Sequence, residues 1–198
     1  MLDIEANTKT AGAYVLYGGY FPFMFGFGAN HGSDELGVVR LGGHRESGET
    51  AIQCAAREVR EESSLDTVFY ENRTIYVGNP GGGNYEKIEG DRRDSPIFVM
   101  RGRENELSVM YLAHGKGTLA PKMETQGVLL LRAEDIERIC PGRITLSEYK
   151  KSGGKCILAG PLPEDAVFVP HIQLRFLNKL FTLERELMAD FMKSYPPI

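Results

Sequence analysis

Three glutamates in one predicted helix could bind divalent cations. Glu58, Glu61 and Glu62 lie in residues 50–62, which contain no Gly or Pro and are rich in alanine and long straight-chain residues, so a helix with Thr50 as its N-cap is expected. At about 100° per residue, the three side chains share an arc of roughly 100°. Like charges four residues apart cost about 0.2–0.5 kcal/mol in an isolated helix, which a hard cation such as Mg²⁺ or Mn²⁺ would offset.

A solvated acidic surface, with Arg57 and Arg60 as counter-charges, is the simpler interpretation of such a helix. The spacing of these glutamates relative to the residues around them favours the metal site. In order, the chain has Gly43, five residues, Glu49, seven residues, Arg57-Glu58-Val59, one residue, Glu61-Glu62, one residue, Ser64 and Leu65. This arrangement, called the box below, resembles the signature sequence of the Nudix hydrolases, with Ser64 in place of the usual Gly. Because glycine suits a helix end with positive φ, Ser64 predicts a different exit from the helix.

The resemblance implies an α/β fold, namely a Nudix-type α/β/α sandwich with a mixed sheet. It also implies a metal site for Mg²⁺ or Mn²⁺, whose expected ligands are the Gly42 carbonyl, Glu58, Glu61 and Glu62. Glu49 and Arg57 resemble the pair that braces the loop at Gly43 against the helix, so these three residues are expected to support the site.

The activity implied is hydrolysis of the pyrophosphate bond of a nucleoside diphosphate linked to another group. Bound cations would screen the phosphate charges and acidify the attacking water. A carboxylate that is not fully committed to metal could accept the proton, and Glu61 or Glu124 is the candidate. Glu124 precedes a predicted strand, as a glutamate does late in the Nudix fold; an ordinary exposed glutamate is the alternative, and Glu106 is a second candidate for this role.

The substrate is expected to be ADP-ribose or a related ADP-sugar, because Pro80 follows the box at a position similar to a proline of Nudix enzymes that act on ADP-ribose. A nucleoside triphosphate is the second choice. A nucleotide-binding regulator without activity is the competing class, although retention of all the box carboxylates argues against it. The candidate substrate-binding residues are Arg40, Pro80, Arg92 and Arg93, of which the last three lie in a glycine-rich stretch, 78–96, that is otherwise a flexible loop.

The remaining pattern alternates strands and helices. We expect residues 1–10 to be frayed, a helix at 133–139 and one long helix from about 170 to 195, whose apolar stripe packs on the sheet or forms a homodimer contact. Aromatic residues between positions 14 and 27 belong to the core or stack on a base. The predicted strands are 11–17, 20–27, 35–41, 67–70, 74–77, 97–101, 107–113 and 128–131.

Composition limits the classes of protein to which the chain could belong. A chain of 198 residues with 42% hydrophobic and 25% charged residues is expected to form one domain, 1–198. The net charge of −4 offers no general attraction to nucleic acid. Three cysteines form no even disulfide framework, which suits the cytoplasm, and Cys54 is expected to be a small buried residue. No stretch reaches the ~18 apolar residues of a membrane span.

Overall fold

The computed structural model describes residues 3–27, 32, 34–80, 83–121 and 125–194, and it confirms the α/β class. The helices are α1 (Ile4–Asn7), α2 (Ala51–Ser63), α3 (Ala133–Ile139), α4 (Leu146–Lys151), α5 (Ile172–Leu183) and α6 (Arg185–Lys193). The strands are β1 (Thr8–Leu16), β2 (Phe21–Gly26), β3 (Glu35–Val39), β4 (Leu41–His44), β5 (Asp66–Phe69), β6 (Thr74–Gly78), β7 (Tyr85–Glu89), β8 (Phe98–Arg101), β9 (Leu107–Lys116), β10 (Gly127–Leu131), β11 (Lys155–Leu158) and β12 (Val167–Pro170).

The chain forms two compact units, each with a mixed sheet. Unit 1 comprises Met1–Val15 and Leu41–Leu119, and unit 2 comprises Leu16–Arg40 and Ala120–Ile198. Because each unit draws on two separate stretches of the chain, neither corresponds to a simple half of the sequence. The expectation of a single domain over 1–198 stays a prediction.

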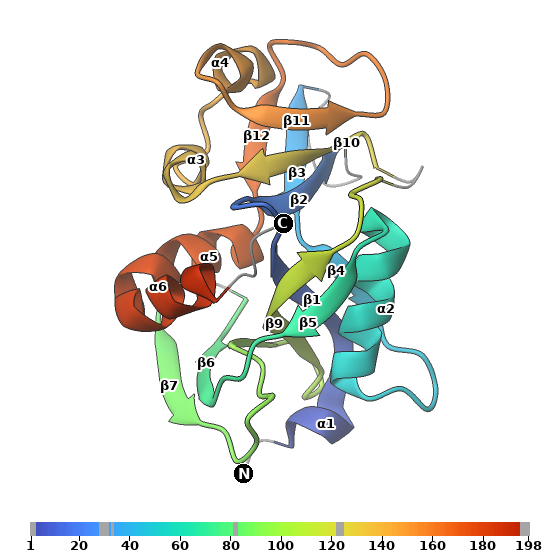
Figure 1. Cartoon of the computed structure of the whole chain (residues 1–198), viewed down its shortest axis with the longest axis vertical. Coiled ribbons are helices and arrows are strands. Elements are labelled where there is room, and N and C mark those ends of the chain that lie inside the picture. The colour runs from blue at the N-terminus through green and yellow to red at the C-terminus, as the bar shows by residue number, and fades with distance from the viewer. Residues whose placement is uncertain (1–2, 28–31, 33, 81–82, 122–124, 195–198) are drawn as a thin grey trace. The chain divides into compact units, whose positions relative to one another are not determined.

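Unit 1 contains a seven-stranded sheet with the order β4-β1-β9-β8-β6-β7, in which β5 pairs with β9 beside this path. Strands β6 and β8 are parallel, whereas β1 and β4 are antiparallel. Helix α2 packs against β4, β5 and β9, and Figure 1 shows it running beside β4 and β5. The box therefore lies on a strand and a helix that are packed together.

Helix α2 rests on small side chains. Val59 and Ser63 are buried, while Ile52 and Ala56 are half-buried. The buried face is completed by Ala51, Cys54 and Ala55. Small residues let the helix approach the strands closely, and this closeness decides which side chains can fit between them.

Three predictions about unit 1 were wrong in detail. Residues 3–10 are ordered rather than frayed, because Asp3 caps α1 and β1 already begins at Thr8. The Gly42-Gly43 pair was expected in a loop but forms part of β4, since β1 offers a pairing partner. The glycine-rich stretch 78–96 contains β7, which pairs with β6 in a hairpin.

Unit 2 contains a five-stranded sheet with the order β11-β10-β2-β3-β12, in which β12 runs parallel to β3. The predicted C-terminal helix is two helices, because Glu184 leaves helical geometry at φ −131°, ψ 58° between α5 and α6. These helices lie side by side in Figure 1. Phe181 and Phe191 both contact the ring of Phe21 on β2, so the apolar stripe packs within unit 2. A homodimer stays a prediction.

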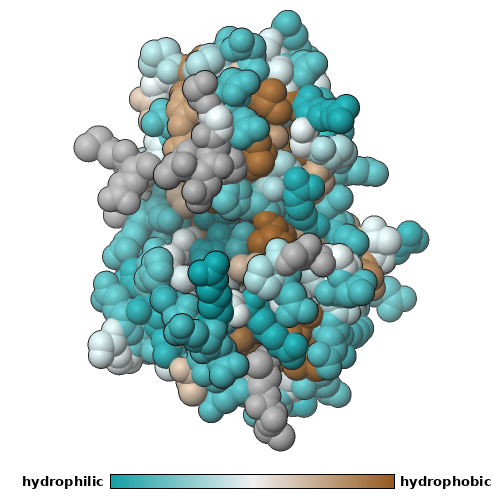
Figure 2. All heavy atoms as spheres, turned by 180° about the vertical axis from the view of Figure 1, so that it is seen from behind, coloured by the Kyte–Doolittle hydropathy of each residue, from teal (hydrophilic) through white to brown (hydrophobic). Residues whose placement is uncertain are grey.

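The aromatic residues of the N-terminal strands belong mainly to the core. Tyr14, Phe21, Phe23 and Phe25 are 0–2% exposed, which leaves them no surface for stacking on a base, whereas Phe27 is 44% exposed. On the face drawn in Figure 2, hydrophilic residues predominate and hydrophobic ones form small separate patches. Within the described ranges, no helix is long and apolar enough to cross a membrane.

Candidate metal and catalytic site

The helix that carries the box glutamates starts where the sequence predicts. The Thr50 hydroxyl accepts a hydrogen bond from the Gln53 amide at 3.3 Å, and the Gln53 side chain accepts one from the Thr50 amide at 2.8 Å. This reciprocal capping satisfies two of the four amides that a helix start leaves without intrahelical partners. The position of the helix start thereby fixes which residues of α2 face β4.

Glu58 occupies the space that a side chain at position 43 would need. A Cβ built on Gly43 would lie 2.4 Å from Oε2 and 2.6 Å from Cδ of Glu58, far inside van der Waals contact. Only glycine therefore lets the Glu58 carboxylate lie against β4 in this position. The strand itself is held by β1, where Ala11 is opposite Gly43. This close approach explains in physical terms why the first position of the box, Gly43, is a glycine.

Glu62 contacts the same strand one residue earlier. The Gly42 amide donates to Oε2 of Glu62 at 2.6 Å, and Gly42 adopts φ 145°, a conformation that favours glycine. This contact is made by the Gly42 amide, so the role of the Gly42 carbonyl as a metal ligand stays a prediction. Two box glutamates, Glu58 and Glu62, are thus brought to two consecutive glycines by the packing of α2 on β4.

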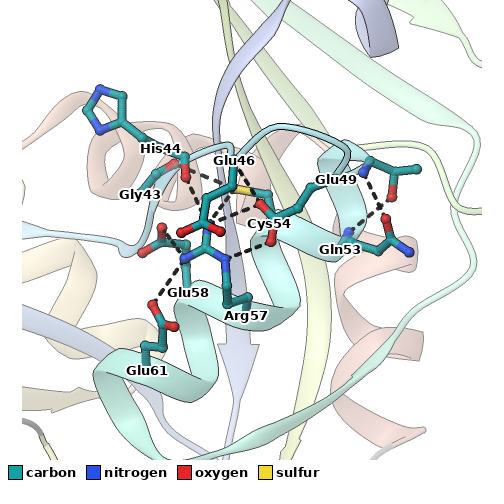
Figure 3. Close-up of polar contacts among 10 residues, drawn as sticks. Gly43, His44, Glu46, Glu49, Gln53, Cys54, Arg57, Glu58 and Glu61 are labelled. Carbon is teal, nitrogen blue, oxygen red and sulfur yellow. Dashed lines mark hydrogen bonds and ion pairs between the residues drawn. The ribbon is translucent and has the colours of Figure 1, made fainter.

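Arg57 joins the loop, the helix and the acidic face (Figure 3). Its Nε and Nη2 atoms donate to the two carboxylate oxygens of Glu49 at 2.7 and 3.1 Å, and Nη2 also donates to the His44 carbonyl at 2.9 Å. Nη1 donates to Glu58 at 2.8 Å and to Glu61 at 3.0 Å. The planar guanidinium, with five donors, can bridge these acceptors in a way that lysine cannot.

These contacts have electrostatic consequences for both partners of the Arg57–Glu49 pair. Hydrogen bonding to Arg57 lowers the pKa of Glu49 below its usual 4.5. Hydrogen bonding to Glu49, followed by that to Glu58, raises the pKa of Arg57 further above its already high value. Both groups therefore stay charged over the whole neutral range, and the brace between the 44–49 loop and α2 is ionic.

The donor chemistry fits a divalent cation. Glu58, Glu61 and Glu62 supply only oxygen ligands, which Mg²⁺ and Mn²⁺ prefer. The Glu61 side chain is 56% exposed, so its carboxylate is accessible for coordination. Among the described residues, however, no three His, Cys, Asp or Glu side chains are gathered closely enough to form a metal centre as they stand.

Ser64 corrects an expectation from the sequence. It ends α2 with φ 61° and ψ 12°, the left-handed geometry of a glycine cap, and its amide donates to the Arg60 carbonyl at 2.9 Å. The helix exit is therefore the one that glycine would make, adopted by a residue with a Cβ. That conformation costs a non-glycine residue about 1–2 kcal/mol, which the surrounding fold must supply.

Two of the predicted substrate-binding residues, Arg92 and Arg93, make ion pairs with neighbouring acidic residues. Arg92 makes a bidentate ion pair with Asp94, at 2.9 and 2.8 Å, and Arg93 contacts Glu71 at 3.4 Å. Pro80 is exposed after β6. Arg40 is half-buried between β3 and β4 and belongs to unit 2. A role in substrate binding stays a prediction for all four.

The sequence offers two other acidic candidates for the general base, Glu106 and Glu124. Glu106 pairs with Lys9 across 2.5 Å, so its carboxylate is already engaged. Glu124 lies outside the described residues. Cys54, as expected, is buried, and burial raises the pKa of its thiol to about 11, which leaves it an apolar core residue rather than a nucleophile.

Sequence reasoning missed one residue that contacts the box from outside it. Glu5, in α1, accepts hydrogen bonds from the Ala51 amide at 2.9 Å and from Arg45 at 3.3 Å. Its carbonyl accepts a further bond from Arg45 at 2.6 Å. The sequence feature that points to α1 is Asp3, because Asp is a preferred N-cap residue. In the structure, its side chain accepts a hydrogen bond from the Ala6 amide.

Comparisons with known proteins give structural neighbours only. No family model and no curated protein sequence matches the chain. A Nudix-family hydrolase from Clostridium perfringens matches with 16% identity over 66% of this chain and 83% of its own, at a TM-score of 0.46. An Ap4A hydrolase from C. elegans, solved as a binary complex, matches with 18% identity over 66% of this chain and 85% of its own, at a TM-score of 0.44.

A Nudix hydrolase from Nitrosomonas europaea matches with 16% identity over 64% of this chain and 57% of its own, at a TM-score of 0.42. Similarity of this size does not assign an activity, which has to be argued from the box and its contacts. In the sequence of its box and in these structural comparisons alike, the chain resembles the Nudix hydrolases.

Proposed function

We propose that this protein is a Nudix-type pyrophosphohydrolase that uses Mg²⁺ or Mn²⁺. The observation that carries the proposal is the close approach of Glu58 to Gly43. The carboxylate of Glu58 fits there only because Gly43 has no side chain. A glycine kept only for chain flexibility would not need a carboxylate in the place of its missing side chain. The Glu62–Gly42 contact repeats the arrangement one residue away.

Each box residue has a distinct proposed task. Glu58, Glu61 and Glu62 would hold the cation, together with the Gly42 carbonyl. The cation, when bound, would neutralise phosphate charge and lower the pKa of the attacking water. Glu61 is the proposed general base, supported by its exposure, which leaves it accessible to water. Glu124 is the second candidate for this role.

Arg57 would position these carboxylates rather than touch the substrate. Its fixed fork holds Glu49 on one side and reaches Glu58 and Glu61 on the other, so the acidic face keeps a defined starting arrangement. Such preorganisation limits the reorganisation needed when the cation and the phosphate arrive. Gly43, Glu49 and Arg57 are therefore supporting residues of the proposed site.

The proposed substrate is ADP-ribose or another ADP-sugar, with a nucleoside triphosphate as the second choice. Pro80, the overall size of the chain and a possible dimer helix favour the first. The test is a panel of ADP-ribose, NADH, dNTPs and dinucleoside polyphosphates with Mg²⁺ or Mn²⁺, read as released phosphate after added phosphatase. Hydrolysis of ADP-ribose with the highest kcat/KM is expected. Preference for a dNTP refutes the substrate assignment, and hydrolysis of none favours a nucleotide-binding regulator.

A further inference from the structure

The N-terminal helix α1 meets the N-terminal end of the box helix. Figure 1 shows α1 beside that end of α2, and the contact is made by Glu5. Its Oε1 accepts from the amide of Ala51, the first residue of α2, at 2.9 Å. That amide is one of those that cannot bond within the helix, and a negative charge there also suits the positive end of the helix dipole.

Glu5 binds the box loop as well as the helix. Arg45, two residues after Gly43, directs Nη1 at both the carbonyl and the carboxylate of Glu5, at 2.6 and 3.3 Å. The Arg45 side chain is 22% exposed, so this contact is partly shielded from water, although Glu5 itself is half exposed. The Glu5 carboxylate therefore contacts the chain both at Arg45, just after β4, and at Ala51, the start of α2.

The segment that follows Glu5 supports the glycines. β1 pairs with β4 so that Thr10 is opposite His44 and Ala11 opposite Gly43, and the Arg45 amide donates to the Lys9 carbonyl at 2.9 Å. Residues 5–11 thus hold the glycine strand through backbone pairing and the helix through Glu5. Gly43 and the Glu58 carboxylate are too close to leave room for even a Cβ between them. The geometry of this contact therefore depends on how residues 5–11 hold both β4 and α2.

We propose that Glu5, which lies outside the box, is a positioning residue of the metal site, an inference that rests on the proposed function. It fixes the start of α2 relative to β4, and the site carboxylates follow because Glu58 lies seven residues, or about 10 Å, further along the same rigid helix. Loss of the anchor lets the helix start move while β4 stays paired with β1. The carboxylates then no longer meet the glycines in one arrangement.

The test compares Glu5→Ala and Glu5→Gln with Glu89→Ala, an exposed glutamate on β7, as the matched control. The probe is Mn²⁺ alone, with affinity measured by electron paramagnetic resonance and amide hydrogen exchange followed in residues 45–53. Loss of a group that orients metal ligands typically weakens metal binding 10- to 100-fold. We expect Glu5→Ala to weaken Mn²⁺ binding about tenfold and to speed this exchange about tenfold.

Glu5→Gln keeps an oxygen that can accept from the Ala51 amide, so it should restore both quantities to within about threefold of wild type. Unchanged Mn²⁺ affinity in Glu5→Ala overturns the inference, whether or not exchange is faster, because Glu5 would then be only a structural contact. Failure of Glu5→Gln to recover also overturns it. A wild-type protein that takes up no Mn²⁺ instead refutes the proposed metal site, and the inference with it.

Discussion

Replacing Gly43 by alanine tests whether the glycine serves the Glu58 carboxylate. The added Cβ would lie 2.4 Å from Oε2, while ordinary contact begins at 3.4 Å, so the carboxylate must retreat by about 1 Å. Because Glu58 is a flexible side chain, the fold should survive this shift. A 1 Å misplacement of a group in an active site can cost about a hundredfold in rate, equivalent to about 2.7 kcal/mol of activation free energy.

The effect on stability should be smaller. The retreat weakens the Arg57–Glu58 hydrogen bond, which as a charged pair contributes about 1.5–3 kcal/mol. Reduced entropy of the unfolded chain returns about 0.4–1 kcal/mol. The net loss of about 0.5–2.6 kcal/mol corresponds to a fall in Tm of about 1–10 °C for a chain of this length. The protein should therefore stay folded while its turnover falls.

The assay is steady-state hydrolysis of the best substrate of the panel at saturating Mg²⁺, with Tm from calorimetry. Gly160→Ala is the matched control, because a Cβ there would meet nothing within 4 Å, and it should keep wild-type turnover and Tm. Gly43→Ala should show kcat about a hundredfold lower. A Gly43→Ala protein with kcat within threefold of wild type would refute the claim that this glycine positions a reacting carboxylate.

Three further predictions address other parts of the site. Glu62→Gln should lower kcat at least about a hundredfold while circular dichroism and Tm stay near wild type, because a neutral amide can still accept from the Gly42 amide but is a poor metal ligand; near-normal activity at saturating Mg²⁺ would contradict the assignment. Ser64→Gly should raise the free energy of unfolding in urea by about 1 kcal/mol by relieving the left-handed conformation, and an unchanged value would show that the serine is not strained. Because the pKa of Glu49 is lowered in the fold, mainly by the hydrogen bond from Arg57, its ionic contribution to stability is present above the usual pKa of 4.5 and is lost as pH falls through the lower folded pKa. The gap between the unfolding free energies of wild type and Glu49→Gln should therefore shrink as pH falls below 4.5, and a constant gap would contradict this.

The box could be predicted from the sequence because its signals are local. The capping at Thr50, the burial of Cys54 and the common face of Glu58 and Glu62 follow from residue type and helical spacing over a few turns. The reason for Gly43 could not, because it depends on the distance between β4 and α2. That distance is set by the small residues beneath the helix, whose identity alone does not fix how closely they pack.

The errors came from contacts between segments far apart in the sequence. Residues 3–10 are polar and suggested a frayed end, but the box loop and β4 supply partners for Glu5 and for the backbone of β1. Ser64 was judged by intrinsic preference, which tertiary structure overrides here. The single C-terminal helix was predicted from a continuous apolar stripe, and a stripe of this kind does not reveal a break such as that at Glu184.

The most direct test of the account is Mn²⁺ binding by calorimetry, in the presence of a non-hydrolysable nucleotide, to the wild type and to a protein carrying both Glu58→Gln and Glu62→Gln. The proposal requires the box carboxylates to be the cation's ligands. The wild type should bind Mn²⁺, and the double variant should bind at least about tenfold more weakly while keeping its fold. Equal affinity in the two proteins, or no Mn²⁺ uptake by the wild type, would contradict the central claim.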